Sequence, residues 1–161
     1  MRHRDNQLYL SATDLALHLA CKHLTQLNRA VAEGRLEAPH WEDPALEMIQ
    51  QRGIAHEEAY LQALAQGGRD ITRLDVSNPE ISSEQTLEAM MRGAEVIVQA
   101  GLQLGRWCGR ADVLLRVETP SKLGAWSYEV IDTKLARETK AGTILQLCLY
   151  TNMVAALQDL S

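Results

Sequence analysis

WCGRADVLLRVETPSKLGAWSYEVIDTK, residues 107–134, contains two apolar runs separated by a turn signal. Side chains at positions i and i+2 of a strand share one face. The first run therefore has one apolar face, which comprises Ala111, Val113, Leu115 and Val117, and an opposite face with Asp112, Leu114 and Arg116. Pro120 and Gly124 mark the turn. We expect a long antiparallel hairpin.

A hairpin centred near Lys122 sets Asp112 directly opposite Asp132, with side chains on one face about 5 Å apart. Lys134 shares a face with Asp132. Two such carboxylates resist ionising together unless a cation lies between them, and Mg²⁺ or Mn²⁺ prefers oxygen ligands of this kind. A neighbouring lysine can orient a water or stabilise phosphate charge. The alternative is a solvated hairpin whose exposed face carries charges.

The composition indicates one globular domain, because 161 residues with 46% hydrophobic content can bury a core. A net charge of −5 argues against a protein that coats nucleic acid, so any contact with nucleic acid must be local. No stretch approaches 18 consecutive apolar residues, and the N-terminus is too polar for a signal peptide. We expect a cytoplasmic protein without membrane contact.

The three cysteines, Cys21, Cys108 and Cys148, are odd in number and widely spaced. This spacing predicts neither a disulfide framework nor a CxxC metal site. The simplest interpretation of each is a small buried apolar side chain.

Two helices are predicted in the N-terminal part. Ser11 and Asp14 resemble a capping box for a helix over 12–33, and Asp43 with Pro44 starts a helix over 44–66. The predicted inward line of the second helix is Leu46, Ile49, Gly53, His56, Tyr60 and Ala63. An inward histidine is either a hydrogen-bonded core residue or a metal ligand. Glu57 and Glu58 are assigned to a solvated face.

The remaining elements predict a mixed α/β (α+β) fold. After a loop or short extended connection over 67–81, a helix over 82–93 is followed by strands over 95–104, 107–118 and 127–135, which form an antiparallel meander. A last helix, 138–158, is apolar on most sides. Gln146 and Tyr150 are i, i+4 neighbours on it. In the simplest interpretation they only interact with each other at the helix surface.

The segments GRAD with Asp112, EVIDTK with Asp132 and Lys134, and QLCLY with Gln146 and Tyr150 resemble, in order and spacing, the PD-(D/E)XK nucleases of the RecB type. SATDLALHLACKHLTQL and RGIAHEEAYLQAL resemble the N-terminal segments of the same family, so the resemblance covers almost the whole chain. The CRISPR-associated RecB-like exonucleases are the nearby alternative. The resemblance implies a restriction-endonuclease-like core in one nuclease domain, with a helical part over 1–93 and a catalytic sheet and helix over 94–161.

The resemblance also implies a site. His56, Asp112, Asp132 and the backbone carbonyl of Thr133 would hold one or two Mg²⁺ or Mn²⁺ ions, and Lys134 would position the attacking water. Gln146 and Tyr150 would brace the site or touch DNA. Three cations near these motifs would contact phosphates unless they only form solvated surface: Arg110, Arg137 and Lys140.

The activity implied by the resemblance is metal-dependent hydrolysis of DNA, on single strands or ends and more as an exonuclease than an endonuclease, in DNA repair, recombination or processing. The alternative is a catalytically inactive DNA-binding or assembly module with the same fold. Cys21 matches the first cysteine of the iron-sulfur members, but a [4Fe-4S] cluster would need cysteines beyond Ser161. The family core has a further strand after the last helix. We therefore expect a C-terminally truncated fragment of a longer protein, with a fused or associated helicase as a partner.

Overall fold

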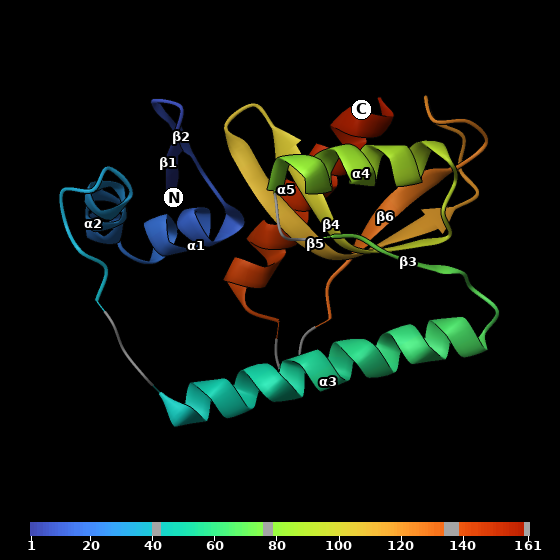
Figure 1. Ribbon diagram of the computed structural model, residues 1–161, viewed down its shortest axis with the longest axis horizontal. Helices are drawn as coiled ribbons and strands as arrows, with labels where there is room; N and C mark the ends of the chain where they lie inside the picture. Colours follow the sequence, from blue (N-terminus) through green and yellow to red (C-terminus); the bar gives the residue numbers. More distant parts are fainter. Residues whose placement is uncertain (40–42, 76–78, 134–138, 160–161) are drawn as a thin grey trace.

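The computed structural model describes residues 1–39, 43–75, 79–133 and 139–159. Its helices are α1 (Ala12–Ala20), α2 (Lys22–Ala32), α3 (Pro44–Gln66), α4 (Pro79–Met91) and α5 (Ala141–Gln158). Its strands are β1 (Arg2–Arg4), β2 (Gln7–Tyr9), β3 (Ile71–Arg73), β4 (Val96–Leu104), β5 (Trp107–Val117) and β6 (Ser127–Ile131). The predicted mixed α/β fold class is confirmed at this level (Figure 1).

The central sheet has the strand order β3-β4-β5-β6. Strands β4, β5 and β6 pair antiparallel, which confirms the predicted meander. Strand β3 pairs parallel to β4 and makes the sheet a mixed one. This three-residue strand lies in the segment predicted as a loop or short extended connection.

Helices cover both faces of the sheet. On one face, Leu61 of α3 packs against Val96, Val98 and Val113. On the other face, residues of α4 and α5 pack against Ile97, Leu114 and Tyr128. The α4 and α5 residues are Ala89, Met90, Tyr150, Met153 and Val154. The sheet is therefore the middle layer, and α5 is buried on its sheet-facing side, whereas Ile144 and Cys148 are exposed.

The N-terminal segment is fastened to one end of the sheet. Strands β1 and β2 form a hairpin whose turn residues, Asp5 and Asn6, have φ values of 48° and 59°, a region these two residue types tolerate better than most. Leu10 then bridges Trp107 at the start of β5, with its N–H bonded to the Arg106 carbonyl and its carbonyl accepting the Cys108 N–H. Helix α1 follows and packs on α5.

Some sequence-based predictions need correction. The helix predicted over 12–33 is two helices, because Cys21 has an extended backbone and serves as the C-cap of α1 and the N-cap of α2. Helix α4 begins at Pro79, before the predicted start at residue 82. Cys21 and Cys148 are exposed, and Cys108 is half-buried, so the buried interpretation of the cysteines is wrong for the first two. No helix in the described ranges is both long enough and apolar enough to cross a membrane.

Candidate functional site

Asp112 and Asp132 lie at the point where β5 and β6 come together. The pairing Val113↔Ile131 confirms the predicted register, and its continuation by one residue sets Asp112 opposite Asp132. Thr133 N–H donates to Asp112 Oδ2 over 3.4 Å, so the two segments are still adjacent beyond the last paired residue. Both carboxylate oxygens of Asp132 are buried. The hairpin thus brings together two acids and the Thr133 backbone.

Gln99 of β4 continues the line of Asp132 and Asp112 onto a third strand. Gln99, Asp112 and Asp132 thus form a row of polar residues. The pairs Val98↔Val113 and Ala100↔Ala111 place Gln99 opposite Asp112. Its φ of 58° is unusual for a residue other than glycine. The facing pattern changes here, because Val98 and Val113 pack against α3 whereas Ala100 and Ala111 pack in the cluster with α4 and α5. The single apolar face predicted from residue 111 to residue 117 is therefore interrupted at Asp112. Strained residues of this kind are often found at functional sites.

Tyr150 reaches the same part of β5 from α5. It is 7% exposed, and a Cβ atom added to Gly109 would lie 2.4 Å from its Cε1 atom and 2.7 Å from its hydroxyl. Only a glycine at position 109 leaves room for this ring. The structure therefore brings Tyr150 to the GRAD segment, within three residues of Asp112. Gln146, one turn earlier on α5, is half-buried.

Helix α3 is rotated relative to the prediction. His56 is exposed, and so are Leu46 and Ile49 of the predicted inward line, with exposed fractions of 51% and 62% for the latter two. The line that faces the sheet passes through Gly53, Glu57, Leu61 and Leu64, and Tyr60 of the predicted line also packs against the sheet beside Leu61. The inward position of His56 is thus wrong, whereas its role as a metal ligand stays a prediction.

Glu57 is the α3 residue that contacts the row of polar residues. Gln99 Nε2 donates to Glu57 Oε1 over 2.7 Å. Its neighbour Glu58 forms an ion pair with Arg73 of β3 at 2.7 Å. The expectation that both acids only face solvent is therefore wrong. The spacing of Gly53, Glu57 and Leu61 in steps of four was the signal that could have identified Glu57.

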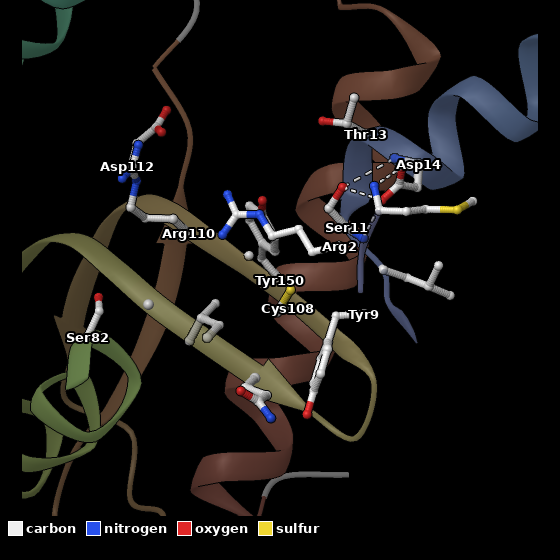
Figure 2. Close-up of a pocket in the computed structure, with 16 residues that line it drawn as sticks. Arg2, Tyr9, Ser11, Thr13, Asp14, Ser82, Cys108, Arg110, Asp112 and Tyr150 are labelled. Carbon is white, nitrogen blue, oxygen red and sulfur yellow. Dashed lines mark hydrogen bonds and ion pairs between the residues drawn. The ribbon is translucent and has the colours of Figure 1, made fainter. Parts of the chain in front are cut away.

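A cleft of about 460 Å³ begins at Asp112 and runs along β5 toward the N-terminal segment. Figure 2 shows Asp112 and Arg110 on one side of it, Arg2, Tyr9 and Ser11 on the other, and Cys108 and Tyr150 between them. A second hollow of about 250 Å³ adjoins the first, since both are lined by Arg2, Tyr9, Gln103 and Cys108. The sequence patterns did not identify four residues of this region. Arg2 and Tyr9 lie across the cleft from Asp112, and Gln99 with its partner Glu57 lies beside it.

The far wall of the cleft is held by a charged capping box. Asp14 accepts hydrogen bonds from the N-terminal amine of Met1 at 2.7 Å, from Ser11 N–H at 2.8 Å and from Ser11 Oγ at 2.7 Å. Burial tends to raise the pKa of Asp14, but these hydrogen bonds together hold it below its usual value. At Cys108, burial raises the thiol pKa, and the positive charges of Arg2 and the amine oppose that effect. Arg2 is therefore within electrostatic reach of Cys108.

The other predicted site residues are placed as follows. Lys134 and Arg137 lie outside the described residues. Lys140 is the exposed N-cap residue of α5 and does not line the cleft, whereas Arg110 does. Cys21 lies at the junction of α1 and α2.

The oxygen donors present suit a hard divalent cation. Mg²⁺ is usually held by one or two carboxylates and keeps water or substrate phosphate in its remaining positions. Asp112, Asp132 and the Thr133 carbonyl match that donor set in chemistry and in number. Among the described residues, no group of three or more His, Cys, Asp or Glu side chains is close enough to hold a metal. A two-carboxylate site is thus the one that these residues fit.

Comparison of the chain with protein-family models, with curated proteins and with solved structures gives no match.

Proposed function

We propose that the chain is a PD-(D/E)XK nuclease of the RecB type, with a restriction-endonuclease-like core, that hydrolyses DNA phosphodiester bonds with Mg²⁺ or Mn²⁺. The observation that carries the proposal is the β5–β6 register, which sets Asp132 opposite Asp112 and brings Thr133 N–H to the Asp112 carboxylate. The contact of Tyr150 with Gly109 supports it further, because it unites two segments of the resemblance in space.

In this proposal each residue has a defined task. Asp112, Asp132 and the Thr133 carbonyl bind the divalent ion, which supplies charge neutralisation at the phosphate and a water of lowered pKa. Lys134 orients the attacking water and stabilises charge on the phosphate. Arg110, exposed at the cleft, binds a neighbouring phosphate. Tyr150 holds β5 in place beneath Asp112.

The test is cleavage of single-stranded and end-labelled DNA with Mg²⁺, with Mn²⁺ and with EDTA. Substitution of Asp112→Ala, Asp132→Ala or Lys134→Ala is expected to lower the cleavage rate about 100-fold or more, since each removes a ligand or a charge at the reacting phosphate. Glu129→Gln is the matched control, because Glu129 is an exposed acid on the same strand as the Asp132 segment. Intact DNA with both metals would overturn the enzyme assignment.

A second candidate is a catalytically inactive DNA-binding or assembly module with the same fold. The exposure of His56 favours it. DNA cleavage by the wild-type protein distinguishes the two, and His56→Ala tests separately whether His56 is a metal ligand. Because the side chain is exposed, folding should be unchanged, and a nuclease that uses His56 should bind Mn²⁺ more weakly, which calorimetric titration measures.

A further inference from the structure

We propose that the cleft along β5 is a track for single-stranded DNA, in which Arg110 and Arg2 bind phosphates and Tyr9 stacks on a base. The inference rests on the proposed function, because it takes Asp112 as the reacting end of the cleft. It adds a binding site on the N-terminal hairpin.

The cleft is continuous from Asp112 to the N-terminal hairpin. The 460 Å³ cleft contains Asp112 and Arg110 at one end and Arg2 and Tyr9 at the other, and the 250 Å³ hollow continues it past Tyr9 to Arg4. From residue 108 to residue 112 the backbone of β5 advances about 13 Å, so the β5 residues that line the cleft lie along the strand and not around one point. A volume of about 460 Å³ lies within the range of protein sites that hold a small ligand.

Two arginine side chains line this cleft. Arg2 and Arg110 are exposed, and within the described part of the chain neither forms an ion pair with an acid. Of the two acids that line the cleft, Asp14 accepts hydrogen bonds from the amine and from Ser11, and Asp112 accepts one from the Thr133 N–H. Both guanidinium groups are thus available for phosphate oxygens, which they can bind through two parallel hydrogen bonds.

Tyr9 lines both the cleft and the adjoining hollow. It is a half-buried ring at the end of β2, directly before Leu10, whose backbone is bonded to Arg106 and Cys108 on either side. The ring is therefore carried on backbone that the sheet holds in place. Aromatic rings beside a positive groove are the usual means by which proteins hold single strands without reading their sequence.

The experiment measures binding of a fluorescein-labelled oligothymidylate by fluorescence anisotropy in EDTA, where neither metal binding nor cutting contributes. Tyr9→Leu should weaken binding about 5- to 100-fold, and Tyr9→Phe should bind like the wild type because stacking needs only the ring. Arg2→Gln should weaken binding and reduce the slope of log Kd against log salt by about 0.7, the value for one lost phosphate contact on a single strand. Arg69→Gln, an exposed arginine outside the cleft, is the control and should change neither quantity.

Thermal unfolding of each variant should match the wild type, which shows that a loss of binding is not a loss of fold. Equal binding by the wild type, Tyr9→Leu and Arg2→Gln overturns the track, and so does a duplex that binds as tightly as the single strand. The outcome is separable from the nuclease assignment. Cutting that persists while these variants bind normally refutes only the track, and binding through Tyr9 and Arg2 without any cutting refutes only the nuclease.

Discussion

Gly109 shows how one missing methyl group determines the geometry of the site. The Tyr150 ring occupies the space that a Cβ atom at position 109 would need, at 2.4 Å from Cε1. Gly53 in α3 is the opposite case, because nothing lies within 4 Å of the Cβ position there and its φ is not positive. Position 109 therefore requires a glycine for steric reasons, whereas position 53 does not.

Gly109→Ala is therefore expected to destabilise the protein by about 1–3 kcal/mol, since the added methyl must displace a buried ring. Gly53→Ala should stabilise it by about 0.5–1 kcal/mol, because it lies inside a helix. Urea unfolding measures both changes. Combining Gly109→Ala with Tyr150→Ala should cost less than the sum of the two single substitutions. Additive costs would show that the two residues do not compete for the same space.

The N-termini of α1 and α3 are capped in different ways. Asp14 stabilises that of α1 through an ion pair and hydrogen bonds, and Asp43 stabilises that of α3 through hydrogen bonds to two backbone N–H groups. Asp14 has three donors, and its pKa is held below the usual value even though burial opposes this. A lowered folded-state pKa means that the stabilisation is complete above the unfolded pKa of about 3.8 and is lost as the pH falls through the folded value. Asp43 at α3 is exposed and accepts only from Ala45 N–H and Leu46 N–H.

Asp14→Asn should accordingly lower the free energy of unfolding by about 1–2 kcal/mol at pH 7, and the difference from the wild type should shrink below about pH 4. Asp43→Asn should cost little at either pH, because asparagine caps a helix as well as aspartate does. Chemical unfolding at pH 7 and pH 3 checks both. A cost for Asp14→Asn that is the same at the two pH values would contradict the role of its charge.

The same elements show what the sequence could and could not predict. The β5–β6 register followed from period-two alternation and one turn centred at Lys122, both local features. Strands β1 and β2 have three residues each, too few to show alternation, and only the Asp5-Asn6 pair marked their turn. The orientation of α3 failed because Leu46 and Ile49 are apolar yet exposed, and periodicity cannot show whether a partner covers a face.

For the whole molecule, the consequence is that α3 is attached through its second half. Leu61 is 2% exposed and packs on Val96, Val98 and Val113, and Glu57 accepts the hydrogen bond from Gln99. Before these residues, Leu46, Met48, Ile49 and Ile54 are exposed by 51–68%. Gln99 lies opposite Asp112 in the register of β4 and β5, so the residue that attaches α3 is a cross-strand neighbour of the acid.

Leu61→Ala should therefore lower the free energy of unfolding by about 2–5 kcal/mol, whereas Ile54→Ala, at 68% exposure, should cost less than about 0.5 kcal/mol. Amide hydrogen exchange should show faster exchange in α3 of the Leu61 variant while β4 and β5 stay protected, because α3 covers only one face of the sheet. Because α3 is bonded to Gln99, and Gln99 lies opposite Asp112, DNA cleavage should fall in the Leu61 variant and stay unchanged in the Ile54 variant. Equal exchange in the two variants would show that α3 is held by contacts other than Leu61.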